Sequence, residues 1–298
     1  MSQISDPMIM NGKLCLVTGS TSGIGNAICK RLAEMNSKIV MISRDRVRGE
    51  VALEEIRRSS GSDSVDLMIA DLSSQKSIHR LVNDFKKKYY KLDVLVNNAA
   101  VFIGKRSFTS DNIETTFAVN HLAPFLLTNL LLDLLKTSAP ARIINVTSSA
   151  HSRFSIDFNN LQGEKKFSAY RAYSMSKLAN ILFTYELAKR LDGTGITVNC
   201  LHPGIVATNL MRESPSLIRL AWKIMSPFFI SPDKSADICA YLASSPLVKN
   251  TTGKYFVKHK NWISGERRIV EKKSSSRSYI EEDMKCLWQE SARLTNTN

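Results

Sequence analysis

A tyrosine and a lysine four residues apart, Tyr173 and Lys177, are the pair in this chain best suited to proton transfer. On an α-helix of 3.6 residues per turn, residues four apart lie on one face, one above the other. Because a cation favours the phenolate, we expect the pKa of Tyr173 to fall from its ordinary value of about 10. Tyr170 has no lysine four residues later. Taken alone, the more common meaning of this spacing is an exposed tyrosine and a surface lysine, so its weight depends on the rest of the chain.

The chain that must position this pair has 298 residues, of which 43% are hydrophobic, and suits one large α/β domain or two small ones. Its 41 Lys and Arg residues outnumber its 27 Asp and Glu residues, which gives a formal net charge of +14. Such a surface attracts a phosphorylated cofactor, an acidic membrane face, or nucleic acid without sequence preference. Because no zinc-finger, basic-zipper or aromatic RNA-binding pattern is present, we expect no specific nucleic-acid partner.

Five cysteines are scattered without a CxxC pair or a Cys/His cluster, at Cys15, Cys29, Cys200, Cys239 and Cys286. An odd, dispersed set favours buried thiols in a reducing compartment over a disulfide framework or a metal site. The first residues lack the pattern of a signal peptide, and no run reaches about 18 apolar residues. We therefore expect a cytoplasmic protein without a transmembrane span or a bound metal, though peripheral membrane contact stays open.

A glycine-rich turn follows the first predicted strand. The apolar run 13–18 (KLCLVT) leads into TGSTSGIG at 18–25, and an amphipathic helix follows over about 24–35. Backbone N–H groups and the positive end of such a helix bind phosphate, and glycines let the backbone approach it. The spacing is GxxxGxG, which differs from the common GxGxxG dinucleotide pattern. A plain turn is the alternative interpretation.

The second predicted strand, 38–43, ends beside a cluster of arginines. In dinucleotide-binding folds, an acidic residue at this strand end binds the ribose 2′-hydroxyl, whereas an arginine accommodates a 2′-phosphate. Here Arg44 comes first, and Arg46 and Arg48 follow. We therefore favour NADP(H) over NAD(H), although Asp45 keeps NAD(H) open and a solvated charge cluster is the alternative.

Two further predicted strands end in polar residues. The run 65–70 is followed by Asp71 and Leu72, where the carboxylate could accept from an adenine amino group. Asp71 or Ser73 could equally cap the next helix. The run 92–96 leads into the sequence NNAA at 97–100, where asparagine amides could tie strand ends together and small residues could let a flat ring pack on the backbone.

The region 112–136 is predicted as one long apolar helix with Asn120 in its middle. Asparagine is unfavourable inside a helix unless its amide has a partner. One interpretation is a satisfied core asparagine, and the other is a kink whose freed carbonyl holds a water. Pro124 favours a break, because it cannot donate to the carbonyl of Asn120.

The fifth predicted strand, 142–146, is followed by Thr-Ser-Ser at 147–149. The sixth, 196–201, is followed by His-Pro-Gly-Ile at 202–205. A hydroxyl at the carboxyl end of a central strand lies where open α/β sheets bind ligands. A lone histidine after a strand, such as His151, is more often structural, and we assign it no role.

The last third of the chain is the least informative. Residues 209–232 mix large apolar side chains with basic ones, as in a substrate lid, a membrane-surface patch over 214–230, or an ordinary core helix. A final strand is predicted over 253–257, and the extension 261–298 is charged and serine-rich, with a helix over 278–293. Together the elements predict a single doubly wound Rossmann domain over 1–298, with a parallel sheet of about seven strands and a core over 11–260.

The ordered motifs resemble those of the short-chain dehydrogenase/reductase family over about residues 11–260. They are TGSTSGIG, DL at 71–72, NNAA, Asn120, Ser148, YSMSK at 173–177 and HPG at 202–204. Each motif is weak alone, and their order and spacing together are specific. Longer stretches, such as FAVNHLAPFLLTNLL and YSMSKLANILFTYELAKRL, are similar to the retinol-dehydrogenase-like branch. The usual last glycine of NNAG is Ala100 here.

The resemblance implies a role for each catalytic residue. Tyr173 would be the general acid/base, and Lys177 would lower its pKa and hold the nicotinamide ribose. Ser148, rather than the adjacent Ser149, would polarise the substrate oxygen, and Asn120 would hold a water in a proton relay to Lys177. The residues that would line the cofactor from adenosine to carboxamide are Gly19, Ser20, Thr21, Gly23, Ile24, Gly25, Asp71, Leu72, Asn97, Ala99, Ile205 and Thr208.

The implied activity is hydride transfer between NADP(H) and an apolar alcohol, aldehyde or ketone, with a retinoid-like or lipid-derived carbonyl as the branch's substrate class. The alternative is a non-catalytic nucleotide-binding or membrane-peripheral interaction protein on the same fold, using the patch 214–230. The sequence leaves open the substrate, the physiological direction and the oligomeric state, for which a homo-oligomer is one alternative.

Overall fold

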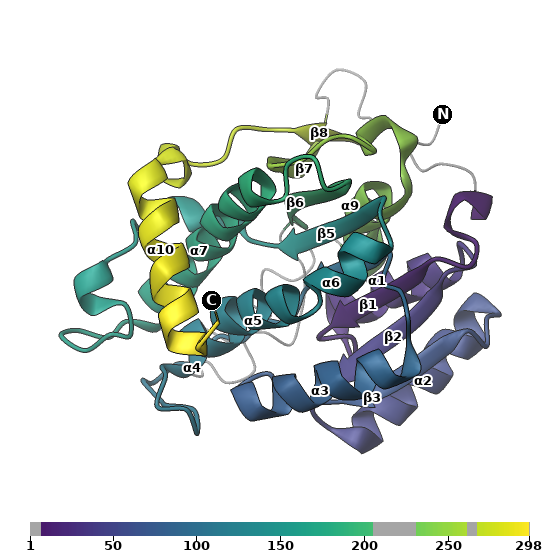
Figure 1. Cartoon of the computed structure of the whole chain (residues 1–298), viewed down its shortest axis with the longest axis horizontal. Helices are drawn as coiled ribbons and strands as arrows, with labels where there is room; N and C mark the ends of the chain where they lie inside the picture. The colour runs from purple at the N-terminus through teal and green to yellow at the C-terminus, as the bar shows by residue number, and fades with distance from the viewer. Residues whose placement is uncertain (1–6, 205–230, 261–266, 298) are drawn as a thin grey trace.

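A central sheet of eight strands carries helices on both of its faces (Figure 1). The computed structural model describes residues 7–204, 231–260 and 267–297. The strand order in the sheet is β3-β2-β1-β4-β5-β6-β7-β8. The strands are β1 (Leu14–Thr18), β2 (Lys38–Ser43), β3 (Val65–Ile69), β4 (Val94–Asn97), β5 (Ala141–Val146), β6 (Ile196–His202), β7 (Lys254–Lys260) and β8 (Arg267–Glu271).

The strands β1 to β7 are parallel, which confirms the predicted doubly wound sheet of about seven strands. The sequence analysis missed β8, which pairs antiparallel with β7, with Val270 opposite Val257. It lies in the extension that was interpreted as a charged tail. A short charged edge strand such as β8 is recognisable mainly from its long-range pairing, because few of its side chains are buried.

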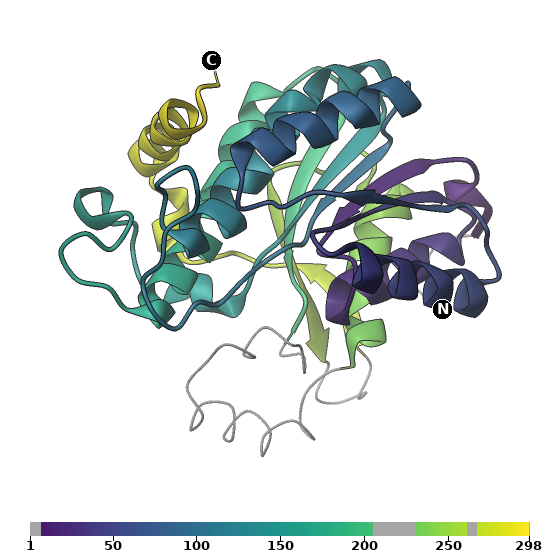
Figure 2. The ribbon, with the colours of Figure 1, turned by 90° about the horizontal axis from the view of Figure 1, so that it is seen from below.

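The helices form one layer on each face of the sheet (Figure 2). On one face α1, α2 and α9 enclose a core with β1 and β2, and on the other α3, α5, α6 and α7 enclose a second core. The helices are α1 (Gly23–Ala33), α2 (Arg46–Ser60), α3 (Gln75–Lys88), α4 (Thr115–Phe117), α5 (Ala123–Leu130), α6 (Leu132–Thr137), α7 (Ala169–Arg190), α9 (Pro232–Ser244) and α10 (Glu281–Thr295).

The chain reverses its direction of winding at β1. From β1 it adds β2 and β3 on one side, and then returns to place β4 and the later strands on the other side. The residues of β1 and β4 are all buried, as expected for strands covered on both faces. In open α/β sheets, ligands bind at the carboxyl ends of the strands where the order reverses. A ligand is therefore expected beyond the carboxyl ends of β1, β4 and β5.

The predicted single helix over 112–136 is wrong. The region forms α4, a π-helical turn over Ala118–Leu122, α5 and α6. Pro124 lies in the first turn of α5, where its missing N–H is tolerated. The predicted break in the helix near Asn120 is therefore confirmed.

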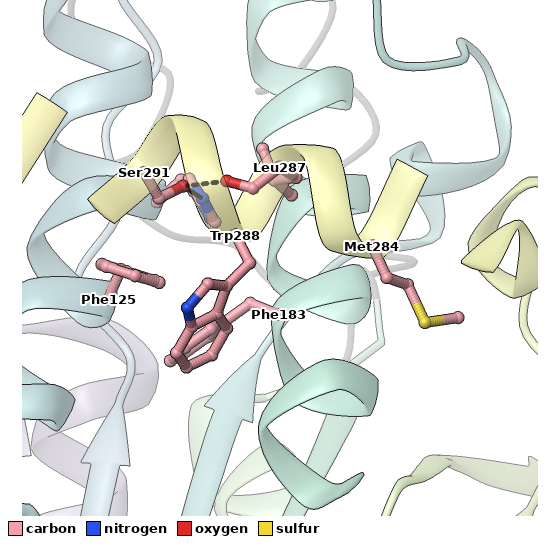
Figure 3. Close-up of a pocket in the computed structure, with 7 residues that line it drawn as sticks. Phe125, Phe183, Met284, Leu287, Trp288 and Ser291 are labelled. Atoms are coloured by element: carbon pink, nitrogen blue, oxygen red, sulfur yellow. Dashed lines mark hydrogen bonds between the residues drawn. The ribbon is translucent and has the colours of Figure 1, made fainter. Parts of the chain in front are cut away.

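The C-terminal extension is folded onto α7 and α5 through α10 (Figure 1). The ring of Trp288 lies 4.9 Å from that of Phe125 and 6.0 Å from that of Phe183 (Figure 3). The predicted helix over 278–293 corresponds to α10, which begins and ends slightly later.

Several predictions concern residues outside those that the structure describes. These are the cofactor contacts of Ile205 and Thr208, the lid up to residue 230 and the membrane patch 214–230. Among the described helices, none combines the length and the apolar character needed to cross a bilayer.

Candidate active site

The structure brings Ser148, Tyr173 and Lys177 together at the carboxyl end of β5. Helix α7 begins after Ser168, whose side chain accepts from the N–H of Arg171, and it buries Tyr173 and Lys177 one turn apart. The ammonium of Lys177 lies 5.7 Å from the centre of the Tyr173 ring and donates to the carbonyl of Val146, the last residue of β5, at 3.2 Å. The hydroxyl of Ser148, two residues later, lies close enough to the phenol of Tyr173 to lower its pKa.

The expected fall in the pKa of Tyr173 is wrong for the protein alone. Burial disfavours the phenolate and raises the pKa of Tyr173 to about 12, although the nearby hydroxyl of Ser148 opposes the shift. Burial likewise lowers the pKa of Lys177 to about 8. Both groups lose hydration on burial, and this loss is the largest cause of each shift. At neutral pH the phenol therefore keeps its proton, which is the form that can act as an acid.

Asn120 lies in the π-helical turn with every polar atom of its amide engaged. Its Nδ2 donates to the carbonyl of Val101 and to the hydroxyl of Ser176, both at 3.0 Å, and its Oδ1 accepts from the N–H of Val101 at 2.7 Å. Its backbone carbonyl accepts from Nδ2 of Asn180 at 2.9 Å. Asn120 is thus both a satisfied core asparagine and part of a helix break, and a water on its carbonyl stays a prediction.

A buried chain of amides and hydroxyls continues from Asn180 to the ends of β5 and β4. The hydroxyl of Thr184 donates to the carbonyl of Asn180 at 2.7 Å and accepts from the amide of Asn145 at 2.9 Å. Asn97 in turn donates to Oδ1 of Asn145 at 2.9 Å. The amide N–H groups of Asn97 therefore tie the strands together, and its contact with a cofactor stays a prediction.

The glycine-rich turn is packed against β4 without room for side chains. A Cβ atom added to Gly25 would lie 2.1 Å from the carbonyl oxygen of Gly19, and Gly19 itself has φ +65°. Asn98, which the sequence analysis did not select individually, donates to the carbonyls of Thr18 and Gly19 at 2.8 and 3.1 Å. The motif NNAA was the signal that could have identified it.

The same turn leaves the amino end of α1 without a side-chain cap. Ser22 stands at the cap position but makes no capping hydrogen bond, whereas the hydroxyl of Ser20 is buried and donates to the carbonyl of Ile42 at 3.1 Å. Thr21, Gly23 and Ile24 lie in this turn and at the start of α1. An uncapped helix end beside a backbone cradle is suited to a phosphate group.

Arg44 and Asp45 follow β2 and are both exposed. The carboxylate of Asp45 caps α2 by accepting from the N–H of Arg48 at 3.0 Å. The guanidinium of Arg46 faces Glu50 on the exposed surface of α2 at 3.5 Å. Within the described residues, no hydrogen bond or ion pair engages the side chain of Arg44, which is thus free to meet a ligand phosphate.

Asp71 and Leu72 follow β3. The carboxylate of Asp71 accepts from the N–H and the hydroxyl of Ser73 at 2.9 and 2.8 Å, so it shapes a turn. The alternative role of Asp71 or Ser73 as helix cap is wrong, because Ser74 caps α3. Leu72 packs partly against the second core. Contact of either residue with adenine stays a prediction.

No group of three or more metal-binding side chains occurs in the part of the chain that the structure describes. Four cysteines, at positions 15, 29, 200 and 239, are buried free thiols. Burial raises the pKa of each of them, so they remain protonated and unreactive near neutral pH.

His121, within the π-helical turn, makes the free energy of unfolding sensitive to acid. It is fully buried, with Nε2 2.8 Å from the hydroxyl of Ser291 and Nδ1 3.3 Å from Oδ1 of Asn180. Burial lowers its pKa to about 4. Because the unfolded chain then binds the proton more tightly, this histidine makes stability fall as the pH drops from 6.5 to 4.

We expect His121→Gln to flatten the pH dependence of the free energy of unfolding by up to about 1.4 kcal/mol per pH unit between pH 4.5 and 6. Urea titrations of both proteins across this range measure the slope. Between pH 7 and 8.5, where the histidine is neutral in both states, the two slopes should agree. An unchanged slope between pH 4.5 and 6 would contradict the assignment.

Comparison with known proteins decides the family. The family model for short chain dehydrogenase matches residues 13–217. This chain belongs to the short-chain dehydrogenase/reductase family.

The relatives of this short-chain dehydrogenase/reductase confirm the retinol-dehydrogenase-like branch. It is 43% identical to mouse retinol dehydrogenase 12 over 258 residues, which are 86% of this chain and 81% of the relative. It is also 43% identical to human retinol dehydrogenase 14 over 267 residues, covering 84% and 80% of the two chains. A solved structure from Pseudomonas aeruginosa, described as an RhlG/NADP active-site complex, is 29% identical with a TM-score of 0.67, covering 85% of this chain and 97% of that one. The chain is therefore an oxidoreductase of the class that acts on CH–OH groups.

Proposed function

We propose that this short-chain dehydrogenase/reductase transfers hydride between NADP(H) and an apolar alcohol, aldehyde or ketone, with retinoid-like carbonyls as the first class to test. The observation that carries the proposal is the meeting of Ser148, Tyr173 and Lys177 beside the carboxyl ends of β5 and β4. The glycine-rich turn at the end of β1 lies next to β4 in the same sheet. One groove along this edge would hold both a dinucleotide and a substrate.

The residues present fit a dinucleotide. The cradle formed by Gly19 and Gly25 excludes any side chain, and the uncapped start of α1 leaves N–H groups for a pyrophosphate. When bound, NADPH would supply the hydride that the protein cannot. Lys177 would hold the nicotinamide ribose, and Arg44 would meet the 2′-phosphate.

In the reductive direction, the phenol of Tyr173 would give its proton to the developing alkoxide, while the hydroxyl of Ser148 donates a hydrogen bond to the same oxygen. The high pKa of Tyr173 in the protein alone suits this donation. Lys177 would favour the resulting phenolate, and the carbonyl of Asn120, which has a second lone pair beyond that bound by Asn180, would hold the water that returns the proton.

NADP preference can be tested at Arg44. Arg44→Asp should raise the KM for NADPH at least about tenfold and leave the KM for NADH within about twofold, because only the 2′-phosphate loses an ionic partner. Steady-state kinetics with both cofactors measure the two values. Equal increases for NADPH and NADH would remove the assignment of NADP preference. Arg46→Asp, at the neighbouring arginine already paired with Glu50, serves as the control for added negative charge.

A screen of NADPH consumption against aliphatic, aromatic and retinoid aldehydes tests the proposed activity. We expect turnover with apolar aldehydes, and about a thousandfold less with the Tyr173→Phe protein used as blank. If wild-type protein binds NADPH but turns over none of these classes, the non-catalytic alternative is favoured. The presence of all four expected side chains, from Asn120 to Lys177, argues against that alternative.

A further inference from the structure

A segment of the C-terminal extension joins the two elements that carry the proposed catalytic residues. One element is the 3-10 turn Ser149–Ser152, which follows Ser148, and the other is α7, which carries Tyr173. The joining segment is residues 274–281, called here the bracing segment. It comprises the 3-10 turn Ser276–Tyr279 and the start of α10.

His151 connects Ser148 to this segment. Its Nδ1 donates to the carbonyl of Ser148 at 2.7 Å, and its Nε2 accepts from the N–H of Ser275 at 3.1 Å. The ring is buried and packs edge-on against Tyr255, with centroids 5.2 Å apart. Because one nitrogen donates and the other accepts, both bonds require one tautomer of the neutral imidazole. The imidazole of His151 thus bridges the carbonyl of Ser148 and the N–H of Ser275 through two hydrogen bonds.

The bracing segment is in turn fixed to α7. The hydroxyl of Ser274 lies 2.6 Å from that of Tyr185, and the rings of Tyr185 and Tyr279 stack with centroids 5.4 Å apart. At the next turns of the helices, Lys189 pairs with Glu281 at 2.8 Å. These contacts attach the segment to the same helix that positions the phenol.

A second link reaches the turn that follows Ser148. The guanidinium of Arg277 donates to the carbonyl of Ser152 at 2.7 Å and to the hydroxyl of Ser155 at 3.0 Å. The bracing segment therefore contacts three residues after Ser148 and two residues of α7.

We infer that His151 is a positioning residue, which transmits the placement of the bracing segment to Ser148 and thereby holds its hydroxyl against the phenol of Tyr173. This inference rests on the proposed function. Proton transfer and hydrogen bonding to a developing alkoxide depend steeply on such placement, and a misplacement of about 1 Å can cost about a hundredfold in rate. The side chain of Ser148 is also fixed within the turn itself, because its hydroxyl accepts from the N–H of Ala150 at 3.2 Å. Loss of His151 should therefore weaken the placement without removing it.

The hydrogen bond from the N–H of Ser275 to His151 can be tested by substitution. Proline at position 275 has no backbone N–H, whereas alanine keeps it. The φ of Ser275 is −58°, which proline adopts, and its side chain makes no capping bond. Ser275→Pro removes the donor to His151, and Ser275→Ala keeps it. We expect Ser275→Pro to lower kcat about tenfold with the KM for NADPH within about twofold, and Ser275→Ala to match wild type. A shared loss in both variants, or none in either, would overturn the inference.

A double-mutant cycle separates this coupling from general destabilisation. His151→Leu alone should lower kcat by a similar factor, and Ser275→Pro should add little in that background, because the same link is already broken. Independent, multiplying losses would overturn the inference. His151→Asn, which keeps a donor near the carbonyl of Ser148, should recover part of the rate.

A readout besides activity distinguishes this inference from failure of the proposed function. Hydrogen–deuterium exchange of the peptide covering residues 147–152 should be faster in Ser275→Pro than in Ser275→Ala, whether or not a substrate is found. Equal exchange in the two variants, with unchanged thermal midpoints, would refute the coupling even in an active enzyme. Inactive wild-type protein that shows the exchange difference would instead count against the proposed function.

Discussion

Replacing Tyr173 by phenylalanine should lower turnover about a thousandfold, because it removes the group that donates the proton to the developing alkoxide. The substitution deletes one oxygen and keeps the ring, which lies 5.7 Å from that of Phe102 in a buried site. The fold and the glycine-rich turn should therefore be unaffected. Binding of NADPH, followed by protein fluorescence, should stay within about twofold of wild type.

The matched control is Tyr170→Phe, three residues earlier on the same helix. Tyr170 is 46% exposed and has no lysine four residues later, so removal of its hydroxyl should leave the rate unchanged. NADPH oxidation with the best aldehyde from the screen measures both variants. If Tyr173→Phe keeps more than a tenth of the wild-type rate, the assignment of the proton donor is lost.

Adding one methyl group at Gly25 should weaken NADPH binding at least about a hundredfold. The new Cβ would lie 2.1 Å from the carbonyl oxygen of Gly19 and 2.5 Å from Nδ2 of Asn98. Neither group can yield without moving the turn, because Asn98 also holds the carbonyl of Thr18. When the turn moves to relieve this overlap, the loss of its hydrogen bonds to a charged phosphate costs about 3 kcal/mol of binding free energy, which corresponds to roughly a hundredfold in affinity.

Gly49→Ala is the control for this substitution. Gly49 lies in α2, and a Cβ there would meet the methyl ends of Leu67 at 2.8 and 3.0 Å, which can rotate away, and Cβ of Ser43 at 3.1 Å. Fluorescence titration gives the affinity for NADPH, and circular dichroism verifies that each variant is folded. Wild-type affinity in folded Gly25→Ala protein would rule out the glycine-rich turn as the cofactor cradle.

Much of the fold was predictable because its signals are local. Buried parallel strands are short apolar runs, and each of the first six predicted runs became a strand of the sheet. The glycine spacing after β1 and the four-residue step from Tyr173 to Lys177 on α7 also depend on neighbouring residues. Their order along the chain was enough to indicate the family and the doubly wound topology.

Other features depend on residues far apart in sequence. The pKa of Tyr173 rises because the packed elements exclude water from its phenol, and a spacing of four residues carries no information on that burial. The edge strand β8 exists through its pairing with β7. The break near Asn120 is completed by Asn180, which donates to the carbonyl of Asn120 from another helix.

The sequence by itself determined which chemical groups this oxidoreductase has and the order of the strands that carry them. The tertiary structure alone decided how these groups are protonated and supported. His151 had no assigned role in the sequence analysis, because its partner Ser275 is 124 residues away. The physical reason is that hydrogen bonding and desolvation act over a few ångströms in space, whichever parts of the chain the folding brings there.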